Sequence, residues 1–221
     1  MNTVIVSKSY ETPPLCEKEI LRYAGCKEAD REILALLKEC VNEAADKLTY
    51  KVCYREFPVT TAGDICDFGA ISLQSKNLAH NLKNCKSVIL FAATIGVEID
   101  RLIAKYGHLA PSKALLLQAI GAERIEALCD LFCEDIAQGT GLSARPRFSP
   151  GYGDLPLSVQ KEIFALLDCE RRIGLTLNDS LLMSPSKSVT AFLGLSDQKG
   201  KPLPNKCSAC TMRNCTFRGA L

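Results

Sequence analysis

The chain has 221 residues, of which 47% are hydrophobic and 24% charged, a composition typical of a globular domain with a buried core. The net charge is only +2, and aromatic residues make up 6% with no tryptophan, which argues against a stacking surface for single-stranded nucleic acid. Residues 1–10 show no secretory signal, and the longest apolar run, residues 87–96, is shorter than the ~20 residues of a membrane span. The sequence therefore predicts a cytoplasmic protein without nucleic-acid or membrane partners.

The first third of the chain alternates between helical and extended patterns. Apolar residues at helical spacing predict helices over residues 17–23 and 27–48. Residues 50–59 alternate apolar and polar side chains and predict a strand. A second extended segment at 64–73 and a short helix at 78–82 follow.

The middle of the chain holds the clearest strand and the longest helix. Residues 87–94 (SVILFAAT) are apolar and partly β-branched, which predicts a buried strand. Helices are predicted over 97–106 and 111–136, and Gly139 and Gly141 end the second one.

The last third mixes loop, helix and strand signals. Residues 143–156 contain three prolines and two glycines and predict a loop. An amphipathic helix at 158–173, capped by Ser158, precedes a β-like stretch at 180–193 that Pro185 interrupts. Helices and strands follow no βαβ rhythm, so we expect an α+β fold in which several helices pack on a mixed or antiparallel sheet.

The sequence divides into a domain at residues 1–196 and a basic, cysteine-containing tail at 197–221. The tail carries five Lys or Arg residues against Asp197, so it either contacts an acidic partner or an anionic cofactor, or is simply solvated. Residues 199–205 (KGKPLPN) read as a linker within it.

Twelve cysteines stand out, and the absence of a signal favours reduced thiols over disulfides. Cys129 and Cys133 are four residues apart in an apolar helix pattern and are expected to be small buried hydrophobes. Cys207, Cys210 and Cys215 form a soft-ligand set that suits an iron–sulfur cluster or zinc, with a fourth ligand from elsewhere. The alternative is a tail with free thiols.

The loop RFSPGYGDLP, residues 147–156, is the strongest candidate for a binding site. Arg147 offers a fork that matches a carboxylate, and Pro150 and Gly151 allow a sharp turn close to a ligand. Tyr152 adds a ring and a hydroxyl. This set suits an amino-acid ligand that also carries a positive centre, such as a sulfonium. The alternative is a structural turn with a solvated Arg and a packed Tyr.

The pattern R-x-x-x-G-Y, completed by Pro156, resembles the signature of the activation domain of cobalamin-dependent methionine synthase. Residues 164–192 are similar to the same domain, which has a helix ending L-L-x-x-E-x-x-x-G, then L-x-x-S and M-x-P-x-x-S-V. The matching residues are Leu166, Leu167, Glu170, Gly174, Leu177, Ser180, Met183, Pro185, Ser188 and Val189. Upstream, residues 93–96 (ATIG) and 119–130 (AIGAERIEALCD) fit compact members of the family.

The resemblance implies an activation-domain fold that binds S-adenosylmethionine and acts as a methyltransferase component. Its partner would be a corrinoid methyltransferase, such as a methionine synthase that lacks its own activation domain. There cob(II)alamin would be methylated after receiving one electron from flavodoxin or ferredoxin.

Carried over by motif, Arg147 would bind the methionine carboxylate, and Pro150, Gly151 and Tyr152 would line the ligand. Glu126 or Glu123 would provide an acidic contact, although either could instead lie on a solvated helix face.

The chain departs from the family after the S-V segment, where Leu193, Gly194 and Leu195 replace the expected aromatic residues. One wall of the ligand site is therefore expected to differ. Two alternatives follow: an iron–sulfur or zinc-binding electron-transfer protein for a corrinoid partner that does not bind the methyl donor, and a non-catalytic docking module.

Overall fold

A computed structural model describes residues 4–197 of the chain. At its centre is a five-stranded sheet in the order β1-β2-β6-β10-β7, in which every neighbouring pair of strands is antiparallel. The strands are β1 (Val6–Tyr10), β2 (Tyr50–Pro58), β6 (Ser87–Thr94), β7 (Ser143–Ala144) and β10 (Ser188–Ser196).

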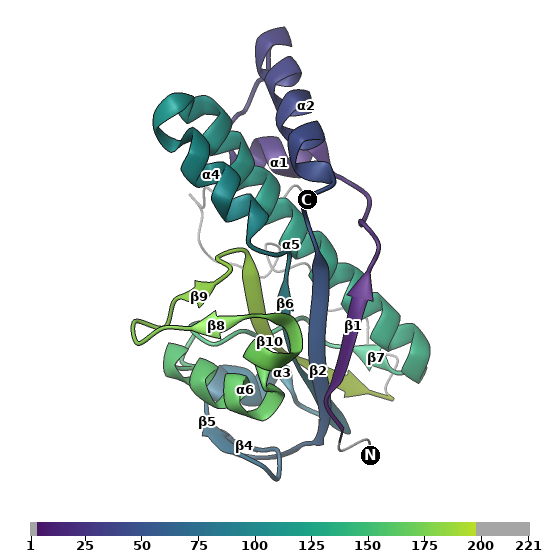
Figure 1. Cartoon of the computed structure of the whole chain (residues 1–221). Helices are drawn as coiled ribbons and strands as arrows, with labels where there is room; N and C mark the ends of the chain where they lie inside the picture. The colour runs from purple at the N-terminus through teal and green to yellow at the C-terminus, as the bar shows by residue number, and fades with distance from the viewer. Residues whose placement is uncertain (1–3, 198–221) are drawn as a thin grey trace.

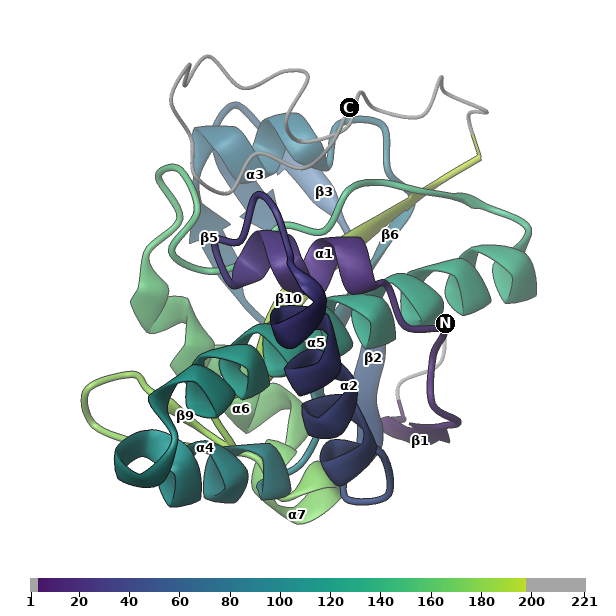
Figure 2. The same ribbon diagram turned by 90° about the horizontal axis from the view of Figure 1, so that it is seen from above.

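Helices pack on both faces of this sheet. One core joins the sheet to α1 (Glu17–Tyr23), α2 (Arg31–Ala45), α4 (Glu98–Leu109) and α5 (Pro111–Thr140). The other joins it to α3 (Lys76–Asn81), α6 (Gln160–Leu167) and α7 (Cys169–Ile173). Both views show α1, α2 and α4 gathered around the long helix α5 (Figures 1 and 2). The expected α+β fold with an antiparallel sheet is confirmed.

The uninterrupted apolar run of β6 follows from burial of the strand on both faces of the sheet. Its eight residues are all buried, and successive side chains point to opposite faces of the sheet. Ile89 and Phe91 enter the core under α5, whereas Val88 and Leu90 enter the core under α6. Because helices cover both faces, neither face needs polar side chains.

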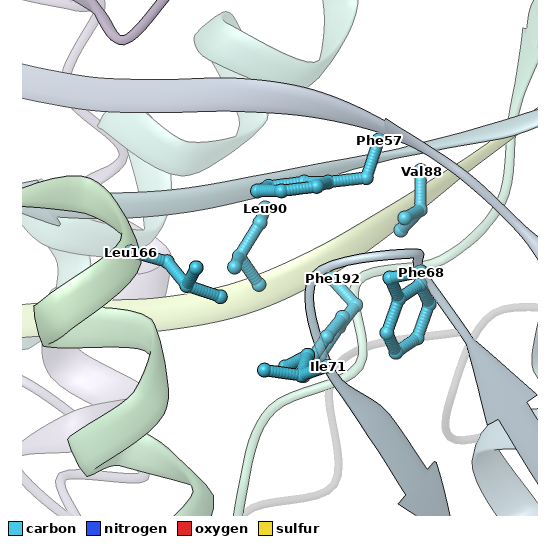
Figure 3. A pocket seen from close by; sticks show the side chains of 7 residues that line it. All are labelled: Phe57, Phe68, Ile71, Val88, Leu90, Leu166 and Phe192. Atoms are coloured by element: carbon cyan, nitrogen blue, oxygen red, sulfur yellow. The ribbon is translucent and has the colours of Figure 1, made fainter. Parts of the chain in front are cut away.

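Smaller sheets extend the second core. One contains β3 (Thr60–Ala62), β4 (Ile65–Asp67) and β5 (Ser72–Gln74), and the other contains β8 (Thr176–Leu177) and β9 (Met183–Ser184). Figure 3 shows where the β4–β5 turn meets the main sheet and α6. The apolar side chains there leave no room for a water molecule; they are Phe57, Phe68, Ile71, Val88, Leu90, Leu166 and Phe192. This region is core rather than a ligand site.

Several predicted elements were wrong in detail. The segment at 64–73 is not one strand but the hairpin β4–β5, which turns at Gly69, a residue in the left-handed region. The helix expected at 158–173 is broken at Asp168, whose φ of 48° is left-handed. Ser158 does not cap it, because Ser158 lies inside a 3₁₀ turn, η1 (Leu157–Val159). Strand β1 was not predicted at all.

Residues 198–221 lie outside the described part, so the domain boundary after residue 196 and the linker at 199–205 stay predictions. Between residues 4 and 197, no helix combines the length and the apolar character that crossing a membrane requires.

Candidate functional site

A cleft of about 430 Å³ opens between the middle of α5 and residues 13–16, which precede α1. This volume lies in the range of small-molecule sites. Its carboxylate-bearing lining residues are Glu19, Glu123, Glu126, Asp130 and Glu134. We call it the acidic cleft; its lining favours a ligand with positive charge.

Arg147 binds two of these carboxylates. Its Nη2 donates to Glu126 Oε2 at 2.7 Å, and its Nη1 donates to Asp130. Glu126 and Asp130 are four residues apart in α5, so their side chains project from the same face of the helix. The Arg147 side chain is only 11% exposed. The 147–156 loop is therefore joined to the acidic cleft through a double ion pair.

Two thiols of α5 also lie beside Arg147. Cys133 Sγ is 4.0 Å from Nη1, and Cys129 is fully buried. Burial lowers the pKa of Arg147, but negative charge around it, including the carboxylates of Asp130 and Glu126, raises that pKa by more, so the guanidinium stays charged. Burial raises the pKa of the Cys129 thiol far above its usual range, so this thiol is neutral. The expected burial is confirmed for Cys129, whereas Cys133 is only half-buried.

The start of the 147–156 loop continues the central sheet. Phe148 exchanges backbone hydrogen bonds of 2.8 and 3.0 Å with Phe192 of β10. Beyond it, Pro150 is buried and Gly151 adopts a φ of +86°, while the Gly151 N–H donates to Leu155 O at 2.9 Å. A left-handed φ of this size favours glycine, so the structure contains the sharp turn predicted at this position.

Tyr152 follows this turn and is 51% exposed. Its ring packs edge-on against Phe148, with 6.3 Å between the ring centroids. Burial raises the pKa of Tyr152, and the negative charge of Glu126 raises it further, whereas Arg147 lowers it. The charges of both Glu126 and Arg147 thus influence the pKa of the Tyr152 phenol. The part that these residues and the Pro150–Gly151 turn play in ligand binding stays a prediction.

Asp154 anchors the far side of the loop to α3. Its carboxylate accepts hydrogen bonds from Ser75 Oγ at 2.5 Å, from Lys76 N at 2.8 Å and from Asn77 N at 3.2 Å. Gly153 has a left-handed φ of +55°, and a Cβ there would lie 2.2 Å from Asn77 Nδ2, so the exposed Asn77 side chain would have to move. The GYGD part of the motif therefore fixes the position of the loop.

A buried ion pair supports the opposite wall of the cleft. Glu123 and Arg124, 4% and 2% exposed, pair at 2.5 Å. Arg124 donates to Pro13 O at 2.6 Å and Pro14 O at 2.7 Å, and Cys16 N donates to Glu123 Oε1 at 3.0 Å. The solvated helix face considered for Glu123 is wrong. This pair holds residues 13–16 against α5.

Sequence reasoning missed three residues of this region. Asp130 could have been found, because it lies four residues after Glu126 on a predicted helix. Arg124 interrupts an apolar stripe between Ile120 and Leu128, which is a signal for a buried charge. Asp154 stands in the motif itself, but its partners on α3 could not be read from the sequence.

The proposed metal ligands Cys207, Cys210 and Cys215 lie outside the described residues. Within residues 4–197, His, Cys, Asp and Glu side chains form no group of three that could hold a metal ion. The cysteine tail therefore remains a prediction from sequence.

The family model described as vitamin B12 dependent methionine synthase, activation domain, matches residues 135–200, which include the 147–156 loop. No curated protein sequence matches the chain.

Among solved structures, the chain is similar to the MetH reactivation domain bound to AdoHcy, with a TM-score of 0.65 and 15% identity. The similarity covers 90% of this chain and 80% of the other. At this identity the comparison establishes a shared fold. The chain is thus similar to the activation domain of vitamin B12-dependent methionine synthase in sequence over residues 135–200 and in fold over most of its length.

Proposed function

We propose that this chain binds S-adenosylmethionine at the acidic cleft and helps to reactivate a corrinoid methyltransferase such as methionine synthase. The observation that carries the proposal is the position of Arg147: the arginine of the R-x-x-x-G-Y motif is held at the carboxylates of the cleft. The MetH reactivation domain, which shares the fold, was solved bound to AdoHcy, the demethylated form of this ligand.

The side chains present fit such a ligand. S-adenosylmethionine carries a sulfonium, an ammonium and a carboxylate. The carboxylates of the acidic cleft suit the two cationic groups, and the planar fork of Arg147 suits the carboxylate. Tyr152 offers a half-exposed aromatic ring near Glu126, which suits a sulfonium or an adenine.

The proposed reaction transfers a methyl group between cofactors. The partner's cobalamin accepts the methyl group together with one electron from flavodoxin or ferredoxin, and S-adenosylhomocysteine remains. The residues of this chain bind and orient the methyl donor, while the bond-making chemistry belongs to the cofactors. We propose a methionine synthase that lacks its own activation domain as the partner.

Isothermal titration with S-adenosylmethionine tests the binding step. Arg147→Ala is expected to weaken binding about tenfold or more, because it removes charge-assisted hydrogen bonds. Arg147→Lys, which keeps the charge but loses the fork, should give an intermediate affinity. Arg101→Ala is the matched control, since Arg101 is ion-paired to Glu98 on the exposed side of α4. No heat with the native protein, or equal affinity for Arg147→Ala, contradicts the proposal.

We also propose that Cys207, Cys210 and Cys215 hold an iron–sulfur cluster or zinc. Support comes from their spacing and from the basic residues around them, which favour thiolates. A low-potential cluster would suit the electron that corrinoid reactivation needs. Anaerobic purification followed by iron, sulfide and zinc analysis tests this, with Cys210→Ser as the variant. A bound cluster without S-adenosylmethionine binding would favour an electron-transfer protein instead.

A further inference from the structure

The guanidinium of Arg147 is already occupied by two carboxylates of its own chain. Nη2 is engaged by Glu126 at 2.7 Å and Nη1 by Asp130. The Arg147 side chain is 11% exposed, so little of the fork faces solvent. Because Glu126 and Asp130 already engage both terminal nitrogens, a ligand carboxylate that pairs end-on with Nη1 and Nη2 competes with them for these donors.

The two carboxylates are not equivalent. The Glu126 side chain is 41% exposed, and its negative charge contributes to the raised pKa of both Tyr23 and Tyr152. The Asp130 side chain is 67% exposed, and among residues 4–197 its carboxylate accepts a hydrogen bond only from Arg147. Asp130 thus gives up its pair at the smaller cost, because water solvates it directly.

The charges around Arg147 also favour the release of Asp130 when a ligand carboxylate binds. Arg147 with Glu126 and Asp130 carries a net charge of about −1, so a third carboxylate brought to the same guanidinium would meet repulsion. That repulsion is relieved when Asp130 turns away.

We propose that Asp130 occupies the place of the ligand carboxylate on Arg147 in the unliganded protein, and that an amino-acid-bearing ligand binds by displacing it. This inference rests on the proposed function, since it concerns the same site. Asp130 then acts as a specificity-determining residue: it lowers the affinity for any ligand that uses Arg147 and leaves untouched those that do not.

Titration calorimetry with two probes tests the inference. S-adenosylhomocysteine carries the carboxylate, whereas 5′-methylthioadenosine lacks the whole amino-acid part. Asp130→Asn is expected to bind S-adenosylhomocysteine about two- to fivefold more tightly than the wild type, the range that one exposed ion pair spans. Its affinity for 5′-methylthioadenosine should not change. Asp130→Ser, which also removes the carboxylate, should behave in the same way.

Two variants of the same helix serve as controls. Glu134 lines the acidic cleft but forms no ion pair within residues 4–197, so Glu134→Gln removes one negative charge without touching Arg147. Asp135 is ion-paired to Lys8 outside the lining of the cleft, so Asp135→Asn removes a comparable surface pair. Neither should tighten S-adenosylhomocysteine binding.

The results of these titrations distinguish failure of the Asp130 displacement from failure of the proposed ligand binding. Unchanged or weaker binding by both Asp130 variants overturns the displacement, even where the wild type binds both ligands. Equal tightening in Glu134→Gln also overturns it, because the effect would then be one of charge alone. No binding of either probe by the wild type overturns the proposed function together with this inference.

Discussion

Asp154 and Ser75, 79 residues apart in the sequence, share a hydrogen bond of 2.5 Å that ties the 147–156 loop to the N-terminus of α3. Ser75 Oγ at the same time caps α3 by accepting from Leu78 N at 3.0 Å. The loop that carries Arg147 and Tyr152 is thus held at one end by the sheet, through Phe148, and at the other by a helix cap.

This contact predicts a pH dependence of stability. The hydrogen bond from Ser75 lowers the pKa of Asp154 from its ordinary value of 3.8. A lowered folded-state pKa adds stability above the unfolded value, and this stability is lost as the pH falls through the folded pKa. Below about pH 4, the free energy of unfolding should fall more steeply in the wild type than in Asp154→Asn. Urea unfolding from pH 3 to 7 measures this, and parallel curves for the two proteins would contradict it.

Gly153 should not tolerate a side chain. Gly153→Ala is expected to lower the free energy of unfolding by about 1–2 kcal/mol for the left-handed backbone alone. The clash with Asn77 adds to this and should weaken S-adenosylmethionine binding. Gly107→Ala in α4 is the control, since a Cβ there meets nothing within 4 Å, and it should stabilise the protein by about 0.5–1 kcal/mol. Chemical unfolding measures the free energy of unfolding of both variants. Equal changes in this free energy would contradict the described conformation of the loop at Gly153.

Arg124→Met tests the buried pair that supports the cleft wall. It leaves Glu123 buried without its partner, and breaking such a pair costs about 3–5 kcal/mol. The loss of both hydrogen bonds to residues 13–14 should also weaken ligand binding. Arg101→Met removes an exposed pair and should cost less than about 1 kcal/mol. Urea unfolding measures both changes. If Arg124→Met lowers the free energy of unfolding as little as Arg101→Met does, the buried pair does not stabilise this wall of the cleft.

Much of the scaffold could be predicted because its signals are local. All residues of β6 are buried, which gives an uninterrupted apolar run, and the buried residues of α5 recur at helical spacing, which gives an apolar stripe. Both patterns can be recognised within a short window of the sequence. The observed bounds of α1 and β6 agree with the predicted ones. Arg147 was found because its motif is contiguous.

What escaped prediction depends on distant partners. Strand β1 has three consecutive exposed residues and is held by pairing with β2 and by Tyr10, which donates to Asp135 at 2.8 Å. Arg124 meets the carbonyl of Pro13, 111 residues away. No pattern within a short window reveals either contact, and the same holds for Asp154 and Ser75.

A crystal structure of the protein with S-adenosylhomocysteine tests the central claim most directly. Ligand density is expected in the acidic cleft, with the ligand carboxylate within hydrogen-bond distance of the Arg147 guanidinium and Asp130 turned away from it. Density elsewhere on the molecule, or a ligand in the cleft that leaves Arg147 paired to both Glu126 and Asp130, would contradict it.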